Sequence, residues 1–316
     1  MEYFADVFSG RFTAPNLSVN AKHLTQTGIE ELAYTQELSP VLWARRGDGQ
    51  LIGCSYKRET LFSSQGPTFM GWHKHTLGSG RTVESIATGP DPSGALESLL
   101  LSTTDTFVSH VEMLNQPLDE GAGQAAGWFL DDAVIPSSTT ETSTNLTVNG
   151  LWHLNGKTVS MTVGGIDCGD YTVSNGSFTA TFGTPALFTK ALVDGGAQIV
   201  VGFTYTSQGQ TVRPVDPKET GSRIGPALGT KRRSDHFAVL FQEAAGVSVG
   251  TNFSKLLPVL FKDDGQNAYA GNQLFSGVWW DTMNDDYTFD GMFAWQITRP
   301  LPCTIVAFGN TLGGED

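Results

Sequence analysis

Short apolar runs separated by turn residues are the dominant pattern of this chain. Val41–Arg45 and Leu51–Tyr56 flank the turn residues Gly47–Gly49, an arrangement typical of a β-hairpin. Trp72–Thr76 and Val83–Thr88 flank a second glycine-containing turn, and we predict that they pair with each other in the same way. Because no long stretch has helical periodicity, the pattern predicts an all-β fold.

Further hairpins are predicted along the rest of the chain. Leu99–Ser102 and Phe107–Leu114 form a third candidate pair, and hairpins at such short intervals are typical of propeller blades or of a sandwich. Thr158–Val163 and Ser177–Phe182 alternate cleanly between glycine-rich turns, which indicates a small β-barrel or sandwich. Thr304–Phe308 is a predicted closing strand.

Composition shifts divide the sequence into four predicted regions. A Gly/Ala-rich stretch precedes residue 128, and a proline-containing loop follows residue 212. The predicted regions are an N-terminal arm at 1–20, a propeller-like β-hairpin region at 21–127, a small β-barrel or sandwich module at 128–212, and a C-terminal β domain at 213–316.

The charge of the chain limits the classes of molecule that it is expected to bind. Charged residues make up only 16% of the 316 residues, which is typical of a surface covered by neighbours or rich in small polar side chains. The formal net charge is −13, so the chain repels phosphate and tight general binding of nucleic acid is not expected. Passage of DNA beside such a surface is compatible with this charge.

No cofactor, metal centre or membrane segment is predicted. Cys54, Cys168 and Cys303 are scattered and form no C-x-x-C motif, so we expect neither a disulfide framework nor a zinc site. The first residues contain Glu2 and Asp6 and lack a long apolar core, and no run of about 20 apolar residues occurs. We therefore expect a chain made in the cytoplasm, without a signal peptide or a membrane span.

Adjacent acidic residues are the first candidates for catalysis. The pairs are Asp131-Asp132, Asp263-Asp264 and Asp285-Asp286. A glycosidase needs two carboxylates across a cleft, whereas adjacent acids on a strand point to opposite faces. We interpret all three pairs as solvated loop acids.

The segment Asp281–Asp286 has some character of a calcium loop but lacks its glycine and final glutamate, so we interpret it as a turn, with a weakly bound cation as the alternative.

Histidines and serines give no clear catalytic motif. His73 and His75 lie on the same side of a predicted strand and could hold a metal or a substrate, but no third ligand is indicated nearby. A structural or exposed pair is the favoured interpretation. Six histidines and many serines leave a Ser-His-Asp triad open, yet no G-x-S-x-G elbow occurs. We predict no catalytic residue.

Two short clusters are candidate contact sites. Lys231, Arg232 and Arg233 form the basic cluster of the sequence, which could contact DNA phosphates or an acidic neighbour, and a salt-bridge patch is the favoured interpretation. Trp279 and Trp280 could stack on sugars. Because aromatic residues are also common anchors of protein interfaces, an interface or core role is preferred for this pair.

An ordered series of motifs runs through most of residues 20–240. The series comprises Ala33–Tyr56, Trp72–His75, Val83–Ala87, Phe129–Asp131, Gly150–Val159, Ile199–Tyr205 and Lys231–Arg233. In this order the motifs resemble the tail nozzle, or tubular tail protein B, family of short-tailed bacteriophages. The resemblance implies a structural protein of the virion tail, which forms a ring, usually six-fold, below the portal and adaptor proteins. It implies a passage for the genome and no catalytic residues.

The resemblance covers roughly the C-terminal half of the family pattern. It therefore implies either a shortened relative or a second chain that completes the β-structure of residues 1–118. The small module resembles an insert labelled by similarity to a domain of ubiquitin-activating enzymes, which implies no ubiquitin chemistry. The implied partners are copies of the chain itself, the portal, adaptor and other tail proteins, and DNA in transit. The alternative hypothesis is a carbohydrate-binding or depolymerising tail fibre or spike-type protein.

Overall fold

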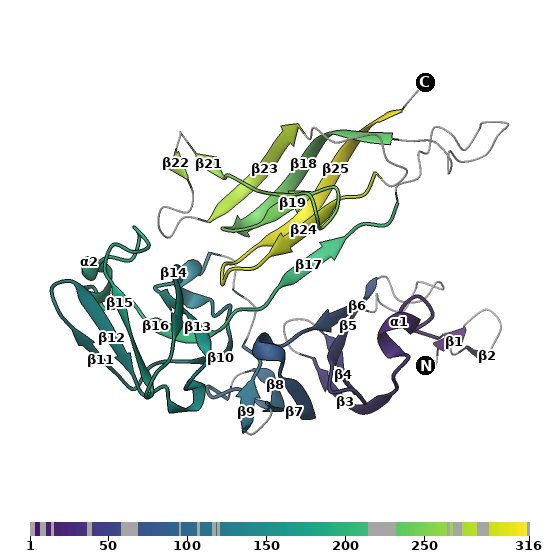
Figure 1. Ribbon diagram of the computed structural model, residues 1–316. Helices are drawn as coiled ribbons and strands as arrows, with labels where there is room; N and C mark the ends of the chain where they lie inside the picture. Colours follow the sequence, from purple (N-terminus) through teal and green to yellow (C-terminus); the bar gives the residue numbers. More distant parts are fainter. Residues whose placement is uncertain are drawn as a thin grey trace. The chain divides into compact units, whose positions relative to one another are not determined.

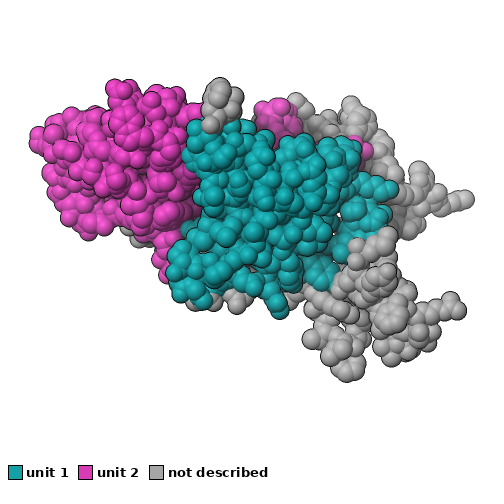
Figure 2. All heavy atoms as spheres, turned by 90° about the horizontal axis from the view of Figure 1, so that it is seen from below, with its two compact units in different colours: residues 1–116 teal, residues 117–316 magenta. Residues whose placement is uncertain are grey.

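Antiparallel strands make up almost all the regular structure of the computed structural model, which confirms the predicted all-β class (Figure 1). The chain divides into two compact units, residues 1–116 and 117–316, which are coloured separately in Figure 2. The structure describes residues 4–6, 11–13, 16–36, 40–57, 69–94, 96–105, 108–115, 118, 121–213, 232–263, 266–267, 274–282 and 291–314.

In its described residues, unit 1 contains three antiparallel sheets, ordered β1-β2, β3-β4-β5-β6 and β7-β8-β9, one short α-helix and one 3-10 helix, η1 (Gly78–Gly80). The elements are β1 (Phe4–Asp6), β2 (Arg11–Thr13), α1 (Lys22–Thr25), β3 (Ile29–Thr35), β4 (Val41–Arg46), β5 (Leu51–Lys57), β6 (Phe69–His75), β7 (Thr82–Pro90), β8 (Glu97–Thr104) and β9 (Ser109–Met113). The first and third predicted hairpins are confirmed as β4–β5 and β8–β9.

The second predicted hairpin is wrong. β6 pairs with β5, whereas β7 pairs with β8 in a different sheet. The physical reason is the core that lies between the two sheets. Val83 on β7 is buried in one cluster with Val41 and Trp43 of β4, and this burial requires β7 to lie opposite the first sheet rather than beside β6. The Val83 amide donates to the Gly49 carbonyl at 2.8 Å, which fixes the start of β7.

Gly49 closes the β4–β5 hairpin where a larger residue would not fit. Its φ is +76°, in the left-handed region that favours glycine. A Cβ atom at this position would lie 2.8 Å from the Cβ of Thr82. The turn chemistry expected from the sequence is therefore also a packing requirement.

Where the structure describes it, unit 2 contains two pairs of larger sheets and the short β21–β22 ribbon. The sheet orders are β10-β16-β13-β14, β11-β12-β15, β17-β24-β19-β20 and β23-β18-β25. The elements are β10 (Asp131–Val134), β11 (Ser138–Glu141), β12 (Asn145–Asn149), β13 (Thr158–Val163), β14 (Ile166–Thr172), β15 (Ser177–Thr181), α2 (Lys190–Asp194), β16 (Ile199–Phe203), β17 (Ser207–Gln210), β18 (Arg232–Ala244), β19 (Ser248–Gly250), β20 (Leu256–Pro258), β21 (Lys262–Asp263), β22 (Gln266–Asn267), β23 (Phe275–Thr282), β24 (Ala294–Ile297) and β25 (Thr304–Gly314).

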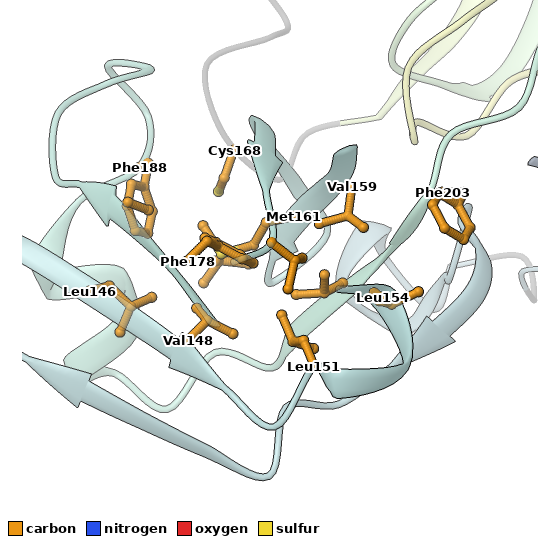
Figure 3. Packing of buried hydrophobic residues seen from close by; sticks show 14 residues of the cluster. Leu146, Val148, Leu151, Leu154, Val159, Met161, Cys168, Phe178, Phe188 and Phe203 are labelled. Carbon is orange, nitrogen blue, oxygen red and sulfur yellow. The ribbon is translucent and has the colours of Figure 1, made fainter. Parts of the chain in front are cut away.

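The first core of unit 2 lies between the sheets that contain β13 and β12 (Figure 3). Val159 and Met161 of β13 face this core together with Leu146 and Val148 of β12, and Phe178 of β15 fills the space between them. The predicted strands in this region are confirmed as β13 and β15. In β15 the period-2 pattern follows burial, because Phe178 and Ala180 are buried and the alternating residues are not. In β13 both faces are buried, and the alternation separates the apolar core residues from the buried polar Ser160 and Thr162.

The second core of unit 2 lies between the sheets that contain β18 and β24. Along β18, Phe237, Val239 and Phe241 are buried, while the alternating residues face outward. Phe241 meets Phe261 edge to face, with ring centroids 5.2 Å apart. β25 extends the predicted closing strand and pairs along most of β18. The finer assignment of propeller blades and of a barrel stays a prediction.

One pair of adjacent acids does not lie in a loop as expected. Asp131 and Asp132 belong to β10 and are half-buried. The register of β10 against β16 shifts between Asp131 and Val134, and Asp132 has a φ of 49°. This irregularity lets two polar residues follow each other in a paired strand. Asp263 lies in β21. The other predicted loop acids, Asp264, Asp285 and Asp286, lie outside the described residues.

Within the ranges that the structure describes, no helix has the length and apolar character needed to cross a membrane.

Candidate functional site

His73 and His75 form a close pair on the inner face of β6. Their Nδ1 and Nε2 atoms lie 2.7 Å apart, and the Nε2 atom of His73 is 3.1 Å from the Ser55 hydroxyl. The indole of Trp43 meets both imidazoles edge to face, at centroid distances of 5.9 and 5.0 Å. The pairing of β4, β5 and β6 places these side chains together, because opposite residues share a face of the sheet.

Glycine provides the space for this pair. Gly53 lies opposite His73, and a Cβ atom there would be 2.2 Å from the Cε1 atom of His73. Burial lowers the pKa of His73, and burial together with the neighbouring His73 lowers the pKa of His75 to about 4. Both imidazoles are therefore neutral near pH 7, and a ring nitrogen of one can donate to the unprotonated ring nitrogen of the other.

The row Ser55, His73, His75 has the order of a nucleophile, a base and an orienting group. Ser55, however, lies within β5, between β4 and β6, so its amide belongs to the sheet ladder and is not a free donor for an oxyanion. In the part of the chain that the structure describes, no group of three His, Cys, Asp or Glu side chains could hold a metal ion. These contacts agree with the favoured interpretation of a structural pair.

A second polar cluster joins the first and second cores of unit 2. Arg299 binds Asp167 through two hydrogen bonds of 2.6 Å, from Nε to Oδ2 and from Nη2 to Oδ1. Its Nη1 also donates to Asp170 at 2.9 and 3.0 Å, and Asp170 accepts a further bond from Ser160. Burial opposes ionisation of Asp170, but the bonds from Arg299 and Ser160 outweigh it and lower its pKa. This cluster fixes β14 against the segment after β24.

The outer face of the β23-β18-β25 sheet is exposed and apolar. We call this surface the outer face; it is formed by Val278 and Trp280 on β23, Leu240 on β18 and Ala307 on β25, with the exposed Val306 beside Ala307 where the register of β25 shifts. Trp280 is 70% exposed, Val278 60%, Val306 53% and Leu240 37%. Val278 and Ala307 both lie opposite Leu240, so apolar side chains cross all three strands at one level. Figure 1 shows β23 and β25 on opposite sides of β18.

The structure separates the two predicted tryptophans. Trp279 lies opposite Val239 and packs against the second core, whereas Trp280 lies opposite Ala238 on the outer face. Neighbouring residues of a strand point to opposite sides, so the pair supplies one core residue and one surface residue. The core and interface interpretations therefore apply to different members of the pair.

The basic cluster is only partly described. Lys231 lies outside the described residues. Arg232 and Arg233 begin β18, opposite Gly314 and Gly313 of β25, and Arg233 is half-buried. These two arginines thus lie at the end of β18 that pairs with the C-terminal end of β25.

Sequence reasoning missed the other members of the outer face. Three of these members are Leu240, Val278 and Val306. In the sequence their neighbours are also apolar, and such a pattern does not show which side of the strand is buried and which is exposed. The sheet order supplies that information, because the opposite side is buried against β24 and its neighbours.

No known family model matches this chain, and no curated protein matches it in sequence.

Proposed function

We propose that this chain is a structural component of a bacteriophage tail, a nozzle or tail-tube part whose copies close into a ring around the path of the genome. The ordered motifs between residues 20 and 240 support this proposal through their resemblance to the nozzle family. In the proposal the chain has no catalytic role. Its partners are copies of itself, expected in a six-fold ring, and the portal, adaptor and other tail proteins.

The exposed outer face is the observation that carries the proposal. Trp280 is 70% exposed beside the exposed Val278, in a sheet whose other side already has a filled core. Contiguous apolar surface of this kind is uncommon on monomeric proteins and marks sites of protein association. Tryptophan is also enriched at the centres of such interfaces. In an assembly of copies, a neighbouring copy covers part of this surface.

The charge of the chain suits a wall around DNA. With a net charge of −13, the protein repels the phosphate backbone and does not hold it in place. The proposal therefore places DNA in transit only, and it assigns the cluster Lys231, Arg232 and Arg233 to contacts with protein neighbours rather than to tight DNA binding.

Electron microscopy tests the proposal directly. We expect negative-stain images of the purified chain to show rings with a central hole, and antibodies raised against it to label the tail of the virus that encodes it. A protein that stays monomeric at micromolar concentration and is absent from purified virus particles would contradict the proposal.

A second candidate function is carbohydrate binding by a tail fibre or spike-type protein. The specific observation in its favour is again Trp280, because an exposed indole on the face of a sheet can stack on a sugar ring. Trp280→Ala should then weaken binding to host polysaccharide at least tenfold. Under the assembly proposal the same variant loses rings, and neither the variant nor the original chain binds or cleaves polysaccharide.

A further inference from the structure

The two outermost strands of the β23-β18-β25 sheet carry few of the charges and prolines that usually protect sheet edges, although the register of β25 against β18 shifts between Ile305 and Ala307. β25 runs for 11 residues without a charged residue or a proline, and β23 contains one charged residue, Asp281, next to its end. Proteins that remain monomeric usually place lysine, proline or inward-pointing charges on such edges, because an uncovered edge offers backbone donors and acceptors to any passing strand.

Both edges are open within the described parts of the chain. β18 pairs with β23 on one side and with β25 on the other, and no described strand pairs with the outer edge of either. At about 3.3 Å per residue, the eight residues of β23 span about 26 Å and the 11 residues of β25 about 36 Å. These lengths are sufficient for a strand-to-strand contact along a whole edge.

We propose that β25 of one copy pairs edge to edge with β23 of the next copy, so that the three-stranded sheets join into one continuous sheet around the assembly. This inference rests on the proposed function in one respect, namely that copies of the chain assemble with each other. It adds which strands meet and in what direction.

The sheet itself indicates a second copy as the occupant. A foreign strand bound to β25 would leave β23 uncovered, whereas a head-to-tail contact between copies covers both edges with one kind of interface. The outer face also becomes continuous, because Val278 of one copy comes beside Ala307 of another, each at the level of Leu240 in its own sheet. Apolar side chains then line the exposed side of the contact between β25 of one copy and β23 of the next.

The direction of the strands makes the contact parallel. β23 and β25 are both antiparallel to β18, so they run in the same direction as each other. In a continuous sheet whose strands run along the ring axis, rotation about that axis keeps this direction, and β25 then meets β23 of its neighbour in parallel. Because the two surfaces differ, the contact is heterologous, and it closes into a ring or continues as a filament.

Cysteine trapping between two singly substituted proteins tests the pairing. One protein carries Val278→Cys, and the other carries Thr304→Cys, Ala307→Cys or Gly309→Cys, three outward positions that cover different registers of β25. Each mixture is oxidised and separated without reductant. We expect at least one mixture to give at least tenfold more disulfide-linked dimer than either of its two proteins alone.

The chain offers matched controls for this experiment. Leu240→Cys places the same thiol at the same level of the outer face, but on the central strand β18. This strand is separated from β23 of the next copy by β25, so Leu240→Cys should not form a disulfide with Val278→Cys. The native cysteines should not form disulfides during the oxidation, because burial raises the pKa of Cys168 and of Cys303 to about 12 and also raises the pKa of Cys54.

The outcomes separate this inference from the proposed function. Rings without any link between β25 and β23 variants overturn the edge pairing and leave the proposed function standing. A dominant link of Ala307→Cys to itself overturns it in favour of a two-fold contact, and a link through Leu240→Cys overturns it in favour of face-to-face packing. Absence of both rings and links overturns the inference together with the proposed function.

Discussion

At the scale of single residues, the histidine pair depends on a glycine that faces it. Gly53→Ala would place a Cβ atom 2.2 Å from His73, so the imidazole must rotate away from His75 or β5 must move. Overpacking of this kind costs about 1–3 kcal/mol of stability. We expect urea unfolding to show that loss for Gly53→Ala. Gly89→Ala on β7 is the control, because its Cβ would meet only the flexible end of Leu100, at 3.2 Å, and a change below about 0.5 kcal/mol is expected.

The same pair makes the stability of unit 1 depend on pH. The pKa of His75 is lowered to about 4 from its ordinary value of 6.5, and that of His73 is lowered as well. The unfolded chain therefore binds protons first as the pH falls, and stability decreases between about pH 6.5 and pH 4. For His75 alone this loss is on the order of 3 kcal/mol.

His75→Gln should remove most of that dependence. We expect the difference in unfolding free energy between pH 7 and pH 4.5 to be smaller in this variant than in the original chain by about 2 kcal/mol. His23→Gln, at an exposed position of helix α1, provides the matched control. Equal pH dependence in His75→Gln and the original chain would show that His75 is not held neutral by the fold.

At the scale of elements, local hairpins could be predicted from the sequence and the pairing of distant strands could not. Gly47–Gly49 identified the β4–β5 turn, and clean alternation identified β13 and β15, because these signals are contained in a few adjacent residues. The separation of β6 from β7 depends on burial of Val83 against another sheet, which no local pattern records.

The same limit applied to the candidate site. The sequence indicated Trp279 and Trp280 as an aromatic pair, but only the pairing with β18 shows which of them is exposed. The contact of Arg299 with Asp167 joins residues 132 positions apart and carried no sequence signal at all.

The Arg299 cluster gives an element-scale expectation of its own. A double-mutant cycle of Arg299→Ala and Asp167→Ala should give a coupling energy of about 1 kcal/mol in the free energy of unfolding, because the contact is bidentate and partly buried. The parallel cycle with Asp170→Ala should give about 0.5 kcal/mol or less, since the Asp170 side chain is 48% exposed. Equal coupling in the two cycles, or none in either, would contradict this ranking.

At the scale of the whole molecule, the net charge of −13 opposes the approach of identical copies. In this account backbone pairing and apolar contact hold the copies together, and neither depends on attraction between charges. Raising sodium chloride from about 0.05 M to 0.5 M screens the repulsion and should increase the assembled fraction measured by sedimentation velocity. Dissociation with rising salt would instead indicate an interface built on ion pairs.

Assembly of the chain into a closed ring can be read from the mass of the purified protein in solution. Mass photometry at nanomolar to micromolar concentration should show one dominant species at a fixed multiple of the 33.9 kDa chain, six for a six-fold ring, and Val278→Lys should shift it to the single chain. A single peak at 33.9 kDa across that range, with or without the substitution, would contradict the account.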